Sequence, residues 1–170
     1  MILAQPAKGT LMIHFSGVQA EPEETQDDVQ VVTAWRGGMV SESVCGEDLP
    51  GILSDEPPAL GGQGSAVNPQ QLMLAAFNAC MTATFVCQAQ RRNIRLQRLD
   101  ITSRATLNML PANTDEPLCP GRLSYVIRVA GEASLAQFDS LHQAVIAGSP
   151  NRWLLAQNMT IIGDLVVDPR

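Results

Sequence analysis

Hydrophobic positions are densest in one long segment near the middle of the chain. Residues 72–89 are apolar nearly all round a helix, and neither glycine nor proline interrupts them. Just upstream, Asn68 suits the N-cap, Pro69 suits the first helical position, and Gln71 can complete a capping box. The pattern therefore predicts a long helix over residues 68–92, and a helix without a polar face is buried on every side.

Shorter periodic segments lie on both sides of this helix. Residues 29–35 and 39–44 predict two strands that turn at Gly37 and Gly38. Three prolines within residues 48–63 indicate a loop without regular structure. The other expected elements, in chain order, are a strand over 9–18, strands over 99–109 and 122–129, a helix over 135–147, a short helix over 151–156 capped by Asn151, and a strand over 159–167.

These elements predict one α+β domain over residues 1–170. Its parts are an N-terminal extension (1–28), β segments with a loop (29–67), the central helix (68–92), and a strand pair, second helix, short helix and closing strand (93–170). The central helix needs more protein around it than so short a chain supplies, which predicts a homodimer. Asparagine and threonine interrupt this helix and no second apolar span follows, which argues against a membrane protein.

Composition narrows the function classes. Apolar residues make up 45% of the 170 residues and charged residues 16%, so the chain can form a core and is not disordered. A net charge of −6 offers no basic face for phosphate groups, which argues against nucleic-acid binding. The N-terminus lacks the features of a signal peptide, so we expect the protein in the cytoplasm, where cysteines stay reduced.

The cysteines and histidines lack the spacing of a metal site. These residues are Cys45, Cys80, Cys87, Cys119, His14 and His142. Since they form neither C-x-x-C nor H-x-x-x-H pairs, we expect no metal, and no motif indicates a cofactor. The large Trp35 and Trp153 are expected in the core or in pocket walls, and Cys87 in the core.

Cys80, in the middle of the predicted central helix, is a candidate nucleophile. A thiol with an ordinary pKa of about 8.5 is only about 3% thiolate at pH 7, and the helix dipole does not extend to a mid-helix position. An adjacent cation would have to activate it, and ten of the eleven basic residues are arginines. The alternative is that Cys80 only packs in the core, as most buried cysteines do.

The sequence around Cys80 resembles a known family. The segment NPQQLMLAAFNAC (68–80) is similar to the NPE-x-L-x-x-A-A-x-x-A-C helix start of the OsmC/Ohr superfamily of osmotically inducible and organic-hydroperoxide-resistance proteins. LGGQGSAVNP resembles the family's glycine-rich approach to that helix, TAWRGGMVSES its first strand pair, and AGSPNRWLL its G-C-P-x-S-x-x-L segment. The resemblance implies an α+β fold, an intertwined homodimer with antiparallel sheets around a long buried central helix, and active sites at the dimer interface.

The resemblance also implies roles for four residues. Cys80 matches the peroxidatic cysteine, which attacks a hydroperoxide and becomes a sulfenic acid. Ser149 stands where the family has its resolving cysteine, and Gln70 stands where it has the glutamate that orients an activating arginine. Arg36 is the candidate for that arginine; the alternative is that Arg36 is a surface residue beside a turn.

Two functions stay open at this point, and with them whether the protein is an enzyme. One is an oxidative-stress protein with peroxiredoxin-like thiol chemistry, a peroxidase that reduces organic hydroperoxides with Cys80 as nucleophile, Arg36 as thiolate stabiliser and Gln70 as its partner. An external thiol, or Cys45, would then replace the missing resolving cysteine. The other is a non-catalytic dimer of the same fold that binds a small apolar ligand, favoured by the loss of the family residues at positions 70 and 149.

Overall fold

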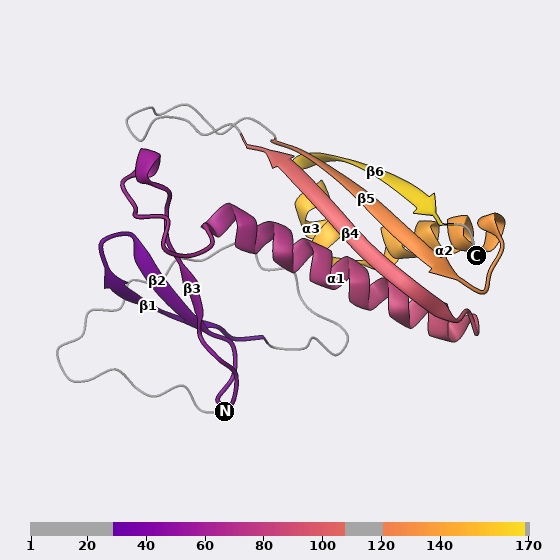
Figure 1. Cartoon of the computed structure of the whole chain (residues 1–170), viewed down its shortest axis with the longest axis horizontal. Helices are drawn as coiled ribbons and strands as arrows, with labels where there is room; N and C mark the ends of the chain where they lie inside the picture. Colours follow the sequence, from indigo (N-terminus) through magenta and orange to yellow (C-terminus); the bar gives the residue numbers. More distant parts are fainter. Residues whose placement is uncertain (1–28, 108–120, 169–170) are drawn as a thin grey trace, which may run out of the picture.

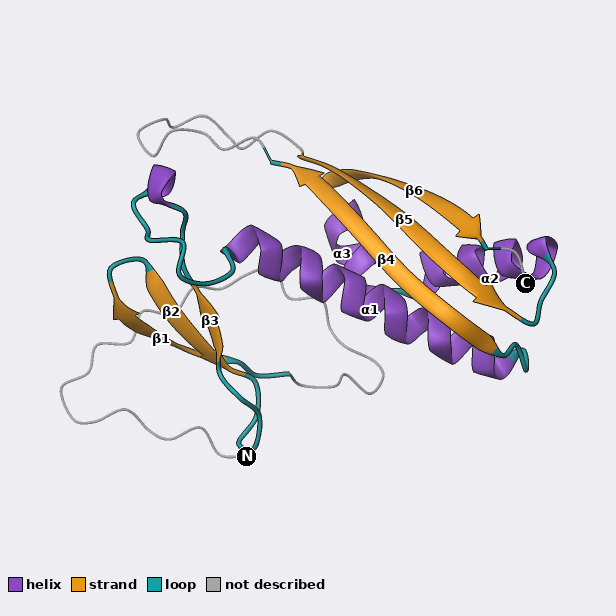
Figure 2. Ribbon diagram, viewed as in Figure 1, coloured by secondary structure: helices purple, strands orange, loops and turns teal. Residues whose placement is uncertain are grey.

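The structure is a computed structural model that describes residues 29–107 and 121–168. The expected strand over 9–18, His14 and Cys119 lie outside the described residues. In chain order the elements are β1 (Val32–Gly37), β2 (Val40–Val44), β3 (Ile52–Ser54), the 3-10 helix η1 (Pro58–Leu60), α1 (Pro69–Arg91), β4 (Leu96–Thr106), β5 (Gly121–Gly131), α2 (Leu135–Gly148), α3 (Pro150–Ala156) and β6 (Met159–Val167). Helices and two sheets occur together in the described residues, so the predicted α+β class is confirmed (Figures 1 and 2).

The first sheet is the antiparallel β1-β2-β3. Its first two strands form the predicted hairpin, in which Gly37 and Gly38 have φ values of 101° and 55° that residues with a side chain rarely adopt. The Trp35 indole N–H donates to the Gly38 carbonyl at 2.9 Å. Trp35 is nevertheless 76% exposed, so the expectation that it lies in the core or in a pocket wall is wrong for a single chain.

The segment between β2 and α1 is more regular than expected. A loop without regular structure was predicted over residues 48–63, and this is wrong, because pairing with β2 orders β3 and the chain then forms η1. The buried Asp55 carboxylate accepts hydrogen bonds from the Ser65 backbone N–H at 3.0 Å and from the Ser65 hydroxyl at 2.8 Å. These bonds hold the pKa of Asp55 below its usual value and fix the loop that leads into α1.

The second sheet has the order β4-β5-β6. Strands β4 and β5 form a long antiparallel pair, from Leu96 opposite Gly131 to Thr106 opposite Arg122. Strand β6 pairs parallel to β5, so the expectation of wholly antiparallel sheets is corrected to one antiparallel and one mixed sheet. The reason is the crossover, because α2 and α3 return the chain to the start of β5 before β6 begins (Figure 1).

The core lies between one face of the second sheet and the helices. Buried side chains alternate along β5 and recur every four residues along α1, the periods of a strand and of a helix. They are Leu123, Tyr125, Ile127 and Val129 on β5, Phe77, Met81, Phe85 and Ala89 on α1, and Phe138, Leu141 and Val145 on α2. Leu135 is exposed at the first position of α2.

Helix α1 begins as predicted, but a single chain buries only one of its faces. Asn68 Oδ1 accepts from the Gln71 N–H at 2.8 Å, and Gln71 Oε1 accepts from the Asn68 N–H at 2.9 Å, which confirms the capping box. Only 22% of the most apolar 18-residue window is buried, and Cys87 is exposed, so its expected core position is wrong here. By length and composition alone α1 could also cross a membrane, a criterion that the core helix of a soluble protein meets as well.

Candidate active site

Cys80 and Ser149 are in direct contact although 69 residues separate them. Cys80 lies in the middle of α1, and the Ser149 hydroxyl donates a hydrogen bond to its Sγ at 3.3 Å. Ser149 is only 1% exposed, whereas Cys80 is partly accessible. The Thr84 hydroxyl, one turn further along α1, donates to the Cys80 carbonyl at 2.8 Å. The two positions that the family resemblance pairs therefore meet in this chain.

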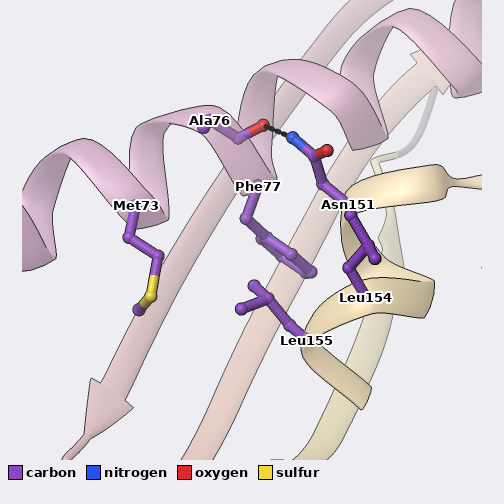
Figure 3. Close-up of a pocket in the computed structure, with 6 residues that line it drawn as sticks. All are labelled: Met73, Ala76, Phe77, Asn151, Leu154 and Leu155. Carbon is purple, nitrogen blue, oxygen red and sulfur yellow. Dashed lines mark hydrogen bonds between the residues drawn. The ribbon is translucent and has the colours of Figure 1, made fainter. Parts of the chain in front are cut away.

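Ser149 is held by the junction of two helices. It ends α2, where its N–H donates to the Val145 carbonyl at 3.0 Å, and it begins α3, where its carbonyl accepts from the Trp153 N–H at 3.0 Å. Asn151 was expected to cap α3, but the N-cap of this helix is Ser149. The Asn151 side-chain amide instead donates to the Ala76 carbonyl at 3.1 Å and ties α3 to α1 (Figure 3).

Two recesses with apolar walls lie in this region, and Ser149 is among the residues that line the wider one. A cavity of about 150 Å³ is lined by Met73, Ala76, Phe77, Asn151, Leu154 and Leu155, and Figure 3 shows Phe77 pointing from α1 toward Leu155 of α3. A wider recess of about 410 Å³ is lined by Ala147, Gly148, Ser149, Pro150, Trp153 and Leu154. Leu154 borders both, and Trp153 is a pocket wall as expected. An apolar molecule in the wider recess would therefore lie against Ser149, which contacts Cys80.

Neither of the other described cysteines is paired with Cys80. Cys45 and Cys87 are free and exposed. Cys87 lies seven residues after Cys80 on the same helix, about 10.5 Å along the axis, which is too far for a disulfide. Within residues 29–107 and 121–168, no three histidine, cysteine or acidic side chains are grouped closely enough to hold a metal ion.

The residues around this site match a family of known proteins. A family model described as OsmC-like protein matches residues 62–162. The chain belongs to the OsmC-like protein family. The match spans more than half of the chain and includes Gln70, Cys80 and Ser149, whereas Arg36 lies before it. The resemblance found in the sequence is confirmed.

Solved structures of OsmC and organic hydroperoxide resistance proteins share this fold. An OsmC-like protein from Mycoplasma pneumoniae is 14% identical with a TM-score of 0.72, over 85% of this chain and 100% of that one. An organic hydroperoxide resistance protein OsmC from Legionella pneumophila is 20% identical with a TM-score of 0.62, over 81% of this chain and 96% of that one. OhrB, the organic hydroperoxide resistance protein of Bacillus subtilis, is 18% identical with a TM-score of 0.59, over 81% of this chain and 97% of that one. No curated protein sequence matches. At these identities the likeness establishes the fold.

Arg36 and Gln70 lie away from Cys80 within one OsmC-like chain. Arg36 is in the β1–β2 hairpin, 54% exposed at its side chain, and its Nε and Nη2 donate to Glu42 Oε2 at 2.8 and 2.6 Å. Gln70 is in the first turn of α1, ten residues before Cys80 and about 15 Å from it along the helix axis. One chain therefore brings together two of the four expected site residues, Cys80 and Ser149.

A buried polar cluster beside Phe77 was not expected from the sequence. The Tyr125 hydroxyl and His142 Nε2 are 2.9 Å apart, and the Phe77 and Tyr125 ring centres are 5.7 Å apart. Burial raises the pKa of Tyr125 and lowers the pKa of His142, and the nearby Arg152 charge also lowers the pKa of His142. Strand alternation indicates that Tyr125 points inward, but no sequence pattern indicates its partner on α2.

Proposed function

We propose that this OsmC-like protein is a thiol peroxidase that reduces organic hydroperoxides with Cys80 as its nucleophile. The observation that supports this most is the Cys80–Ser149 contact inside the matched family segment, at the edge of apolar recesses. Walls of leucine, phenylalanine and tryptophan favour an alkyl or aryl hydroperoxide over hydrogen peroxide. The Legionella and Bacillus structures of the same fold are named organic hydroperoxide resistance proteins.

In this reaction the Cys80 thiolate attacks the terminal oxygen of the hydroperoxide. The S–O bond forms as the O–O bond breaks, the alcohol leaves after taking up a proton, and Cys80 becomes a sulfenic acid. A serine hydroxyl cannot close a disulfide, so Ser149 cannot resolve this species. An external thiol attacks the sulfur instead and releases water to give a mixed disulfide; a second thiol then frees the Cys80 thiolate as an external disulfide forms.

The same proposal includes a homodimer. The described residues leave large apolar side chains exposed on both sheets and on α3, among them Val32, Trp35, Ile52, Ile162 and Trp153. Most of α1 is also uncovered within one chain. A second copy would bury these surfaces and could bring its Arg36 and Gln70 to Cys80, where an arginine stabilises the thiolate. We further propose a cytoplasmic protein that binds neither membranes nor nucleic acid.

The alternative function is a non-catalytic dimer that binds a small apolar ligand. The smaller cavity, which Phe77, Leu154 and Leu155 help to line, favours this candidate, because it is lined by almost no polar atoms that could take part in chemistry.

Dimedone labelling after one equivalent of cumene hydroperoxide separates the two functions. Peroxidase chemistry predicts a dimedone adduct on Cys80 that is absent in Cys80→Ser and unchanged in Cys87→Ser, the control on the exposed side of the same helix. A folded protein whose Cys80 stays unmodified would exclude the peroxidase. Native mass spectrometry that finds a bound apolar molecule in that protein would favour the ligand-binding dimer.

A further inference from the structure

Ser149 uses its side chain differently from most serines at a helix N-cap. An N-cap serine usually accepts a hydrogen bond from a backbone N–H in the first turn of its helix. The Ser149 side chain makes no such bond with α3, and its hydroxyl donates to Cys80 Sγ instead. Its backbone N–H and carbonyl are both bonded within the α2–α3 junction. The hydroxyl is therefore fixed in place and directed at sulfur.

A sulfenic acid has three main fates. It condenses with a thiol, it condenses with a backbone nitrogen, or a second peroxide oxidises it irreversibly to a sulfinic acid. At the place where the family has a second thiol, this chain has a buried hydroxyl that can donate to the oxidised sulfur or to its oxygen. Such a hydrogen bond withdraws electron density from a sulfenate and lowers its reactivity toward a second peroxide.

We propose that Ser149 is a positioning residue that preserves oxidised Cys80 as a long-lived sulfenic acid and leaves its reduction to a small monothiol. This inference rests on the proposed peroxidase function. The proposed route for the monothiol is the recess of about 410 Å³ that Ser149 lines together with Trp153 and Leu154. Ser149 changes no bond itself: the incoming thiol forms the S–S bond, the S–O bond breaks, and the leaving hydroxide takes up the thiol proton and departs as water.

Two variants at position 149 and a matched control test the inference by intact mass after one equivalent of cumene hydroperoxide. In Ser149→Ala we expect the lifetime of the dimedone-reactive state to fall about tenfold and the sulfinic fraction to rise with excess peroxide, the size expected for one lost hydrogen bond to a charged group. Ser149→Thr keeps the hydroxyl, and the extended backbone at this position suits threonine, so we expect the lifetime of the dimedone-reactive state to match that of the unmodified protein. Ser140→Ala, at an exposed serine on α2, is the matched control and behaves as the unmodified protein.

Ser149→Cys tests the geometry independently of sulfenic acid lifetime. With a thiol in place of a hydroxyl 3.3 Å from Cys80 Sγ, we expect a disulfide in place of the dimedone adduct, and no mixed disulfide with 2-mercaptoethanol. In the unmodified protein we expect Cys80 to form the mixed disulfide with 2-mercaptoethanol. A lifetime in Ser149→Ala within twofold of the unmodified protein would overturn the role of Ser149 and leave the peroxidase intact. Absence of any Cys80 adduct in the unmodified protein would instead reject the peroxidase itself.

Discussion

Gly163 of β6 faces the ring of Tyr125, and a side chain at this position has no space. A Cβ on residue 163 would lie 2.0 Å from Tyr125 Cζ and 2.4 Å from its hydroxyl oxygen. Gly163→Ala therefore displaces the ring, and with it the hydrogen bond to His142 and the contact with Phe77. The substitution tests whether this buried cluster is a rigid part of the core.

The expected cost combines two effects. Overpacking a close-packed interior costs about 1–3 kcal/mol, and leaving a buried polar group without its partner costs about 1–3 kcal/mol more. We therefore expect Gly163→Ala to lower the free energy of unfolding by about 2–6 kcal/mol, measured by urea denaturation with tryptophan fluorescence. Gly148→Ala is the control, because its Cβ would meet only Thr84 Cγ2 at 3.8 Å and alanine favours a helix.

Repeating Gly163→Ala in a Tyr125→Leu variant tests whether the loss of stability comes from the clash with the Tyr125 ring. In Tyr125→Leu the clashing ring is gone, so adding Gly163→Ala should cost less than about 1 kcal/mol, and the two substitutions should couple strongly. The reasoning is refuted if Gly163→Ala alone is within about 0.5 kcal/mol of the unmodified protein. It is equally refuted if its cost is the same in the Tyr125→Leu background.

Two further predictions concern the start of α1 and the effect of pH. Asn68→Ala removes one bond of the capping box and should lower the free energy of unfolding by about 1 kcal/mol in urea, whereas Gln90→Ala, exposed near the other end of the helix, should have little effect. Burial lowers the pKa of His142, so below about pH 6.5 the unfolded chain takes up a proton that the folded protein refuses. Stability should therefore decrease as the pH falls from about 6.5 through the folded pKa and then level off, and His142→Gln should flatten this part of the profile.

Elements with local signals were predictable from the sequence. The capping box of Asn68 and Gln71 and the turn at Gly37 and Gly38 depend on residues within four positions of one another. The closing strand, predicted over residues 159–167, has those bounds in the structure. In each case the residues that determine the conformation are neighbours in the chain, so a pattern within a short window contains the information.

Features that depend on distant partners were not predictable in this way. β3 was missed because β2 orders it, and the parallel direction of β6 follows from the crossover. Cys80 and Cys87 lie on the same helix, yet one contacts Ser149 and the other is exposed, because α2 and α3 cover only part of α1. The resemblance indicated that positions 80 and 149 would meet; residue periodicity alone could not indicate this, since the two positions are 69 apart in the sequence.

The Arg36–Glu42 pair bears on how an active site could form in a chain that has Gln70 in place of the family glutamate. Glutamine can hydrogen-bond a guanidinium but cannot balance its charge. Glu42 supplies a carboxylate that accepts from both Nε and Nη2 of Arg36, a geometry that fixes the guanidinium plane. An exposed ion pair contributes only about 0–1 kcal/mol, so Glu42 orients Arg36 without holding it back from a thiolate. If the proposed dimer brings Arg36 to Cys80, its carboxylate partner is therefore Glu42 on its own hairpin, and the change at position 70 does not by itself exclude catalysis.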